Sequence, residues 1–478
     1  MFKQYIDGKL VEGKGSPFDV INPANDEVAG QVGAADASQA IEALEAAQRA
    51  FDPWRKLSIN QRLDWMKKLR DAFVDEQDKL IELTSCEIGK PIGQTISEMG
   101  LLMACFDFYM NEARVLTGEV LPGLGDISGA GYHYLHYRPI GVAVGHLAWN
   151  FPLYNAGLKI GPALASGCTL VLKPSSKSPL SALYMGEIAA KIGFPAGVLN
   201  IISGPSSTVA KTLNQSRIPR LITLIGSSET GIQLLNEGAT NIKQYSLELG
   251  GNTPFIVAPD ATVDDAAAFT VMRKTLFSGQ ACGSINRVYV HKSLHDEYVQ
   301  KVLDGLQKVR LGWGSEYTSP ADMGPVIDYA SRDRLFGLID DAKAKGADVL
   351  FGGDIPSKWT KGSWISPTLL DGVTDNMTIV QKEIFGPIIS VLSYTDFDEM
   401  IERANNTQYG LTSYLFTHDM RLIAKCTEEL DAGEVLVNAP AIGVNLPHIG
   451  IKESGVGCDG SKFSFHEYLQ MKRISIKP

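Results

Sequence analysis

The chain has 478 residues and a formal net charge of −10, and 44% of its residues are hydrophobic and 21% charged. This composition is typical of a globular protein with two or three domains and a large buried core. The acidic balance, without a cluster of five or more lysines or arginines, argues against nucleic acid or an anionic membrane surface as the main partner.

The six cysteines are widely scattered, and no C-x-x-C pair or close histidine pair suggests a zinc site. We therefore expect free thiols in a reducing compartment, and no bound metal. The N-terminal segment has no apolar signal core. The most apolar stretch, 139–172, is interrupted by polar residues and proline and does not predict a membrane span. A cytoplasmic location is the expectation.

Residues 36–84 are predicted to be helical. Ile41, Leu44, Ala47 and Phe51 recur at helical spacing, as the apolar face of a helix does. We expect Ser58 to cap the helix that follows, because a serine side chain accepts a hydrogen bond from the first backbone N–H groups of a helix.

From residue 140 onward the chain alternates between predicted strands and helices. The strands are 140–144, 169–172, 198–202 and 221–225, and the helices are 156–165, 178–192, 207–214 and 229–236. This alternation predicts a parallel, doubly wound sheet.

A second alternation begins at 254–257 and continues to about residue 440. Its units are helix 263–276, strand 286–290, helix 295–308 and later segments at 331–351 and 396–416. We therefore predict two α/β domains. Residues 132–137 and 471–476 alternate like exposed strands outside both units, and they are expected to form a projecting sheet that joins subunits.

Two glycine-rich segments contain the residues for covalent aldehyde chemistry. Cys282 lies in Phe-Ser-Gly-Gln-Ala-Cys-Gly, and Glu248 lies in Leu-Glu-Leu-Gly-Gly-Asn. A thiolate can attack a carbonyl carbon, and a carboxylate can take a proton from water. Three small neighbours leave room at the thiol: Gly279, Ala281 and Gly283. Each segment alone has a plainer explanation, a structural cysteine or a glutamate in a solvated turn.

Asn150 follows the first strand of the predicted sheet, in Ala-Trp-Asn-Phe-Pro-Leu. Its side-chain amide, together with the backbone N–H of Cys282, could stabilise the oxyanion that forms on thiolate attack. The alternative is a Trp-Asn turn that packs on the core.

Three further segments favour nucleotide binding. Lys173 and Ser176 lie in Lys-Pro-Ser-Ser, directly after a buried strand, where open α/β sheets bind nucleotides. Gly226 and Ser227 lead from a strand into a helix, whose N-terminus favours a pyrophosphate. The third segment is Lys-Glu-Ile-Phe-Gly-Pro, residues 382–387. Each is also compatible with an ordinary turn.

The ordered set of motifs resembles the aldehyde dehydrogenase superfamily along nearly the whole chain. The motifs are Trp-Asn-Phe-Pro, Lys-Pro-Ser-Ser, Gly-Ser-x-x-x-Gly, Glu-Leu-Gly-Gly, Gly-Gln-x-Cys, Glu-Ile-Phe-Gly-Pro and Lys-x-Ser-Gly-x-Gly. The resemblance implies an α/β fold of two doubly wound parallel-sheet domains with a small β oligomerisation domain. The implied parts are a nucleotide-binding domain (1–121 and 139–250), a catalytic domain (251–445) and oligomerisation strands (122–138 and 460–478).

The resemblance also implies NAD or NADP as cofactor, an aldehyde as the small-molecule partner, and a homodimer or homotetramer. The implied catalytic residues are Cys282, Glu248 and Asn150, acting through a thiohemiacetal and a thioester. The implied cofactor-binding residues are Trp149, Lys173, Ser176, Gly226, Ser227, Gly231, Leu249, Gly250, Glu383 and Phe385. Two alternatives stay open: a coenzyme A-acylating semialdehyde dehydrogenase, and a catalytically silent binding or structural relative.

Several positions depart from the family pattern. Phe277 replaces the usual Asn, Ala148 the usual Pro, and His448 a common Phe, while Leu158 stands where relatives acting on acidic aldehydes carry Arg. The expected substrate-binding residues are Tyr154, Asn155 and His448, whose polarity favours a short hydrophilic aldehyde such as lactaldehyde, glycolaldehyde or succinate semialdehyde. Ser176, where NAD-selective relatives carry Glu, with Lys173 and Lys177 nearby, predicts that both NADP and NAD are used.

Overall fold

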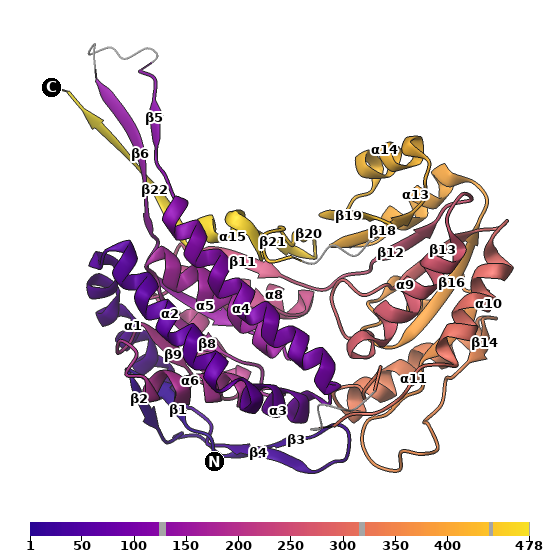
Figure 1. The fold of residues 1–478 in the computed structure, drawn as a ribbon, viewed down its shortest axis with the longest axis horizontal. Helices are drawn as coiled ribbons and strands as arrows, with labels where there is room; N and C mark the ends of the chain where they lie inside the picture. The colour runs from indigo at the N-terminus through magenta and orange to yellow at the C-terminus, as the bar shows by residue number, and fades with distance from the viewer. Residues whose placement is uncertain (124–130, 315–320, 439–442, 478) are drawn as a thin grey trace.

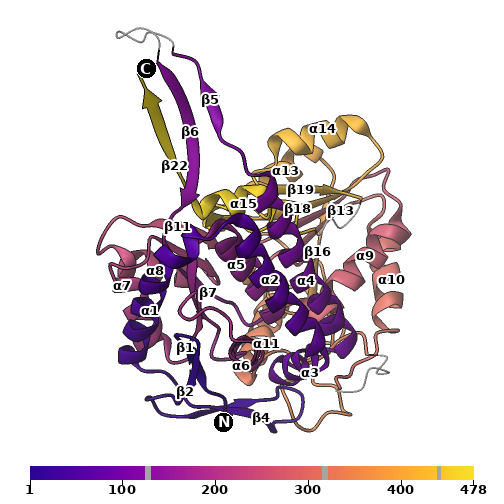
Figure 2. The ribbon, with the colours of Figure 1, turned by 60° about the vertical axis from the view of Figure 1, so that its left-hand side comes forward.

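The structure, a computed structural model, describes residues 1–123, 131–314, 321–438 and 443–477. Two α/β bodies lie side by side, and a narrow three-stranded sheet projects from the first of them (Figures 1 and 2). In the described part of the chain, no helix is long and apolar enough to cross a membrane.

The first body contains an eight-stranded sheet. Its strand order is β2-β1-β9-β8-β7-β10-β11-β21. The central strands are parallel: β7 (Val142–His146), β8 (Thr169–Lys173), β9 (Leu199–Ile201), β10 (Leu221–Ile225) and β11 (Gln244–Glu248). Antiparallel strands complete the edges: β1 (Gln4–Ile6), β2 (Lys9–Val11) and β21 (Gly455–Val456).

Helices cover both faces of this sheet. One face carries α1 (Ala37–Lys56), α7 (Lys211–Gln215) and α8 (Ser228–Gly238); the other carries α2 (Ile59–Asp75), α3 (Gln77–Ile88), α4 (Ile92–Val115), α5 (Pro152–Ser166) and α6 (Leu180–Lys191). Alternate residues of each strand point to opposite faces, so Val142 and Val144 pack in one core and Ala143 in the other. Strands buried on both faces explain the nearly continuous apolar runs of the sequence.

The second body repeats this layering around a seven-stranded sheet of order β14-β15-β16-β13-β12-β18-β19. Its strands are β12 (Pro254–Val257), β13 (Arg287–His291), β14 (Asp348–Phe351), β15 (Thr368–Asp371), β16 (Ile388–Tyr394), β18 (Thr412–Phe416) and β19 (Glu434–Val437). On one face lie α9 (Val263–Thr275) and α10 (His295–Leu306), and on the other α11 (Tyr329–Ala344), α12 (Thr378–Gln381), α13 (Phe397–Asn405) and α14 (Met420–Glu429). The predicted fold class is confirmed.

Most predicted elements form within a few residues of the expected bounds. The expected helix cap is present, and two helices differ in detail from the prediction. Ser58 caps α2, and Gln61 completes a reciprocal capping box. Ile41, however, is 48% exposed, and α1 instead packs a face of small residues, including Ala40 and Ala43, on the sheet. The predicted helix 207–214 begins as a π-helical turn, Ser206–Ala210, before α7.

The projecting sheet consists of β5 (Glu119–Leu121), β6 (Tyr132–Pro139) and β22 (Leu469–Ile476). The predicted strands at 132–137 and 471–476 are thereby found as antiparallel partners. β5 begins before the expected boundary at 122, and residues 124–130 of that predicted segment lie outside the described residues. Val120, Tyr132 and Met471 are 88%, 69% and 66% exposed, so the sheet presents apolar side chains to its surroundings.

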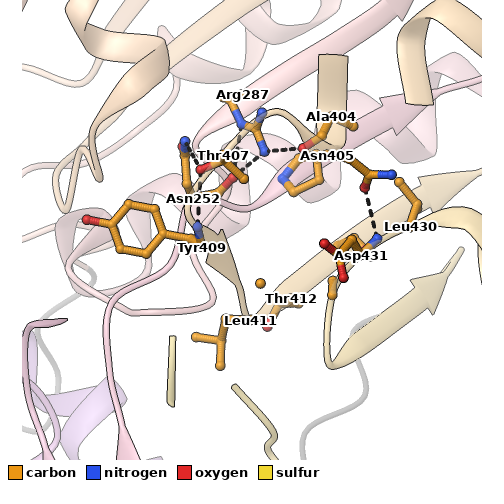
Figure 3. Close-up of a pocket in the computed structure, with 14 residues that line it drawn as sticks. Asn252, Arg287, Ala404, Asn405, Thr407, Tyr409, Leu411, Thr412, Leu430 and Asp431 are labelled. Atoms are coloured by element: carbon orange, nitrogen blue, oxygen red, sulfur yellow. Dashed lines mark hydrogen bonds between the residues drawn. The ribbon is translucent and has the colours of Figure 1, made fainter. Parts of the chain in front are cut away.

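A buried arginine at the start of β13 bonds to two other segments of the second body, the residues before β12 and the end of α13. Arg287 is 1% exposed and donates to the carbonyl of Asn252 at 3.0 and 2.8 Å and to those of Arg403 and Ala404 at 3.1 and 2.8 Å. Figure 3 shows the bonds from Arg287 to Asn252 and Ala404, beside an enclosure of about 10 Å³, enough for roughly one water molecule. The guanidinium satisfies the last carbonyls of α13 and holds the chain that leads into β12.

Replacing Arg287 by methionine is expected to destabilise the fold. Three backbone carbonyls would lose their donor, and each unpaired buried acceptor costs about 1–3 kcal/mol. We expect the thermal midpoint, followed by circular dichroism, to fall by several degrees. Arg55→Met is the control, because Arg55 pairs with Asp52 on the exposed surface of α1 and such pairs contribute about 0–1 kcal/mol. Equal midpoints for the two variants would contradict the role of Arg287.

Candidate active site

Cys282 is half-buried in the loop that connects a short 3-10 turn, Leu276–Gly279, to β13. The turn has an unusual backbone, with φ of 46°, 55° and 68° at Phe277, Ser278 and Gly279. A Cβ at Gly279 would meet the carbonyl oxygen of Gly386 at 2.3 Å. Gly279 is therefore required for close packing of two loops, whereas the sequence alone suggested access for substrate.

The imidazole of His448 lies beside the thiol. Its Nε2 is 3.5 Å from Sγ of Cys282, and its Nδ1 is 2.7 Å from Oε1 of Glu434, the first residue of β19. Burial lowers the pKa of His448, but the neighbouring thiol and the carboxylates of Glu434 and Glu248 outweigh it and raise the pKa well above its usual value. Glu434 was not identified from the sequence, where it is an isolated glutamate in no recognisable motif.

Glu248 is the last residue of β11 and lies 3.9 Å from Nε2 of His448. Its side chain is 3% exposed, and neither oxygen has a hydrogen-bond partner among the described residues. Burial raises its pKa well above the usual range; Asp459 and Cys282 add to this, and His448 and Lys159 oppose it. A buried carboxylate with free oxygens beside a thiol is suited to bind and deprotonate a water molecule.

A second buried ion pair lies behind Glu248. The ammonium group of Lys159, on α5, is 2.6 and 2.8 Å from the two carboxylate oxygens of Asp459. Both side chains are 5% exposed or less. The pair joins the first body to the C-terminal segment that also carries His448, because the backbone N–H of His448 donates to the carbonyl of Asp459 at 2.8 Å.

Asn150 is held by a buried lysine that the sequence analysis did not identify. Nζ of Lys90 donates to the carbonyl of Asn150 at 2.9 Å and pairs with Glu98 at 2.5 Å. Glu98 also accepts from the backbone N–H groups of Leu153 and Tyr154, at 2.8 and 3.3 Å, and so caps α5. The amide nitrogen of Asn150 donates to the carbonyl of Gln280 at 3.1 Å, which places it beside the Cys282 loop.

Asn155, one of the expected substrate-binding residues, and Phe277 both contact neighbouring residues of the protein. The amide of Asn155 donates to the carbonyl of Ala148 at 3.3 Å and to Oδ1 of Asn150 at 3.5 Å, so it orients Asn150. Phe277 is 1% exposed and lies 4.2 Å from Nζ of Lys90 in a cation–π contact.

Tyr154 is the other expected substrate residue, and it remains close to the reactive groups. Its side chain is half-buried at the start of α5. Burial raises the pKa of its phenol, with further contributions from Cys105, Asp459, Cys282 and Glu434. The phenol is thus a neutral hydrogen-bonding group near Cys282 at every physiological pH.

A cavity of about 620 Å³ opens beside Cys282 and is lined by residues of both bodies. It includes eleven of the predicted positions: Trp149, Asn150, Lys173, Ser176, Gly226, Ser227, Leu249, Gly250, Cys282, Glu383 and Phe385. Gly231 is not among the lining residues of this cavity; a Cβ there would meet the side chain of Leu249 at 2.7 Å, so the glycine allows α8 to pack closely on Leu249. Most of the predicted cofactor residues are therefore brought together.

The donor set fits a dinucleotide. Burial lowers the pKa of Lys173 to about 8, and its Nζ has a long contact of 3.5 Å with the carbonyl of Pro174, which leaves it available to ribose hydroxyls. Ser227 caps α8 at the N-terminus, the end of a helix that favours an anion. Burial raises the pKa of Glu383 to about 7, and Gly251 donates to it at 3.1 Å. Lys177, expected to add free positive charge, instead pairs with Asp328 at 2.6 Å.

Comparison with known proteins gives consistent results. A model of the aldehyde dehydrogenase family matches residues 10–474. The 3,6-anhydro-alpha-L-galactose dehydrogenase of Vibrio sp. (strain EJY3) is 34% identical over 480 residues, covering 99% of each chain. The succinate-semialdehyde dehydrogenase (NADP(+)) of Escherichia coli is 34% identical over 486 residues, covering 100% of this chain and 98% of the relative. The crystal structure of lactaldehyde dehydrogenase from Escherichia coli gives a TM-score of 0.95 at 31% identity, covering 100% and 99%.

The support of Asn150 by Lys90 can be tested with one single and one double variant. Lys90→Met leaves the Glu98 carboxylate buried and unpaired, which typically costs about 3–5 kcal/mol. Lys90→Met with Glu98→Leu removes both charges, so we expect much of the stability to return. Turnover should stay at least tenfold low in the double variant, because neither the Asn150 carbonyl nor the start of α5 regains its partner. Wild-type turnover of the double variant would show that the pair does not position Asn150.

Proposed function

The chain belongs to the aldehyde dehydrogenase family, and from this membership we propose that it oxidises a short hydrophilic aldehyde to its carboxylic acid. The proposed cofactor is NAD or NADP, as in the family. The observation that carries the proposal is the polar cluster at the nucleophile, where His448 lies 3.5 Å from Cys282 and bridges to Glu434.

Cys282 is the proposed nucleophile. Its thiolate attacks the aldehyde carbon, and the carbonyl electrons move to the oxygen, which Asn150 stabilises by hydrogen bonding. The bound nicotinamide cofactor supplies the acceptor for the hydride that leaves the same carbon. What remains on the enzyme is a thioester of Cys282.

Glu248 is the proposed base for hydrolysis of that thioester. It takes a proton from a water molecule, the water oxygen bonds to the acyl carbon, and the carbon–sulfur bond breaks to regenerate the thiolate. The unpaired oxygens of Glu248 beside Cys282 support this role. They also favour water over coenzyme A as the acyl acceptor, because transfer to a thiol does not need a buried base at this position.

The position of His448 favours an aldehyde with an oxygen on the carbon next to the carbonyl. In the adduct, that oxygen is three bonds from Sγ, so it falls within reach of a ring that is itself 3.5 Å from Sγ. An apolar chain would offer no acceptor to the His448 nitrogen that faces Cys282, and a buried polar group left unpaired costs about 1–3 kcal/mol. The name of the similar lactaldehyde dehydrogenase is compatible with this choice, whereas succinate semialdehyde has no oxygen on that carbon.

We further propose that two or four copies assemble through the projecting sheet. The exposed apolar side chains of β5, β6 and β22, among them Val120 and Met471, support this assembly because they are costly to leave in water. The functional site itself lies within one chain.

Glu248→Gln should separate the two half-reactions. Hydride transfer needs the thiolate, whereas hydrolysis needs the base, so we expect a burst of reduced cofactor equal to the enzyme concentration, followed by turnover at least a hundredfold slower. Stopped-flow absorbance measures both phases. Cys282→Ala is the matched control and should give neither burst nor turnover while still binding cofactor. A burst-free Glu248→Gln with normal turnover would refute the assignment of the base.

A panel of aldehydes tests the substrate class. We expect kcat/KM to be highest for a two- or three-carbon 2-hydroxyaldehyde, lower for succinate semialdehyde and at least tenfold lower for hexanal, with acid and not coenzyme A thioester as product. Reduced cofactor is followed by absorbance and the acid by mass spectrometry. The proposal is wrong if hexanal is the best of these substrates.

Cofactor choice should be broad. Ser176 lines the cavity without a charge that would repel a 2′-phosphate, so NADP is expected to work within a thousandfold of NAD, about 4 kcal/mol. Asp328 competes for Lys177, so Asp328→Asn should lower the KM for NADP more than that for NAD. An unchanged ratio of the two KM values in this variant would mean that Lys177 lies outside the phosphate site.

A further inference from the structure

Three side chains from separate elements form a relay at the nucleophile. Glu434 at the start of β19 is 2.7 Å from Nδ1 of His448, and Nε2 of the same ring is 3.5 Å from Sγ of Cys282. Thr412 donates to the second oxygen of Glu434 at 2.9 Å, which fixes the orientation of the carboxylate. A carboxylate that holds one ring nitrogen leaves the other nitrogen aimed at the sulfur.

We propose that His448 and Glu434 keep Cys282 as a thiolate before any aldehyde binds, through an imidazolium–thiolate ion pair. His448 then acts as a catalytic residue, because it contacts the reacting sulfur, and Glu434 acts as a positioning residue. The inference rests on the proposed role of Cys282 as nucleophile. It differs from a purely substrate-binding role for His448, since it operates in the free enzyme.

The charges around His448 favour its protonated form. From β11, Glu248 lies 3.9 Å away, and from β19, Glu434 accepts from the ring. Their effect, with that of the Cys282 sulfur, exceeds the opposing effect of burial on the pKa of the ring. Asp459, whose backbone pairs with that of His448, is neutralised by Lys159.

The β18 side of the site adds one phenol and one cation. Tyr414 has its phenol pKa raised by burial and is therefore neutral; it accepts from Arg273 at 3.0 Å. Arg273 also donates to the carbonyl of Gly283 at 3.0 Å, so its charge is directed to backbone and phenol oxygens. An imidazolium at His448 is thus surrounded mainly by negative partners.

The relay leaves the proton balance of the reaction unchanged. When the sulfur–carbon bond forms, the carbonyl electron pair moves to oxygen, and His448 keeps its proton. The sulfur loses its negative charge in this step, so the Nε2–H of His448 becomes free to bind an oxygen on the neighbouring carbon of the substrate. When Glu248 activates water and the carbon–sulfur bond breaks, the thiolate returns to the imidazolium without any proton transfer.

The test is the pH dependence of Cys282 alkylation in the full-length enzyme without cofactor. The probe is iodoacetamide between pH 5.5 and 9.5, and the Cys282 peptide is quantified by mass spectrometry. An ordinary cysteine, with a pKa of about 8.5, is only about 1% thiolate at pH 6.5. At that pH we expect the wild type to react at least tenfold faster than His448→Phe or His448→Gln, and about three- to tenfold faster than Glu434→Gln.

The rates at pH 9.5 provide the internal control for folding. A cysteine with an ordinary pKa of about 8.5 is largely ionised there, so the Cys282 rates of all variants should converge on the wild-type rate if the loop is intact. His295→Gln is the matched control, because it removes a histidine of α10 that pairs with Asp371 of β15, and it should follow the wild-type curve throughout. Curves that superimpose from pH 5.5 to 9.5 for wild type and His448 variants would overturn the relay.

The alkylation assay is independent of aldehyde oxidation. If the curves separate but no aldehyde is oxidised, the relay stands and the proposed function fails. If aldehydes are oxidised but the curves coincide, the proposed function stands and the relay fails.

Discussion

The short crossing from β11 to β12 is the constraint on which the site depends. Glu248 ends β11 in the first sheet, and Pro254 begins β12 in the second, with only residues 249–253 between them. The carboxyl ends of the first parallel sheet therefore face the amino ends of the second.

The site residues come from both sides of this boundary. From the first sheet, at or after the ends of strands, come Asn150, Lys173 and Glu248; from the second, before strands or at their starts, come Cys282, Glu383 and Glu434. The crossing thus brings the base and the nucleophile to the same seam, the boundary between the two bodies. The glycines of the crossing allow this contact, because a Cβ at Gly251 would meet the carbonyl of Cys282 at 2.5 Å.

The seam is expensive to build because it is full of charges removed from water. Three pairs offset this cost at different points, Lys90 with Glu98, Lys159 with Asp459, and His448 with Glu434. Buried pairs of this kind contribute little net stability, since desolvation cancels much of the attraction. Their value is geometric: each pair joins segments that are distant in the chain, and a displaced partner would leave a buried charge unpaired. The positions of the groups around Cys282 are therefore maintained, because moving one partner of a pair would cost free energy.

The sequence predicted the strands and motif residues that depend on local sequence pattern. β8, β10 and β12 appear where apolar, β-branched runs indicated them, because burial on both faces leaves a strong signal. Motif residues such as Cys282 and Glu383 were also found in the same cavity. The sequence did not identify Lys90, Glu98 and Glu434. Their roles depend on contacts between distant segments, and their neighbours in the sequence do not distinguish them from surface charges. For a related reason, sequence spacing did not show that Asn155 contacts Asn150 or that Phe277 contacts Lys90.

Two buried carboxylates with raised pKa values compete for the role of base, and their hydrogen bonds distinguish them. Glu383 accepts from the backbone N–H of Gly251, so one of its oxygens is already committed to holding the loop. Among the described residues, neither oxygen of Glu248 has a hydrogen-bond partner, and Glu248 lies 3.9 Å from the ring that contacts the nucleophile. The cation at His448 stabilises the ionised form of Glu248 that burial opposes. A single histidine thus supports both reactive groups: it favours the thiolate needed for attack and lowers the pKa of the base needed for release. This double role gives a physical reason for a histidine rather than an apolar residue at this position.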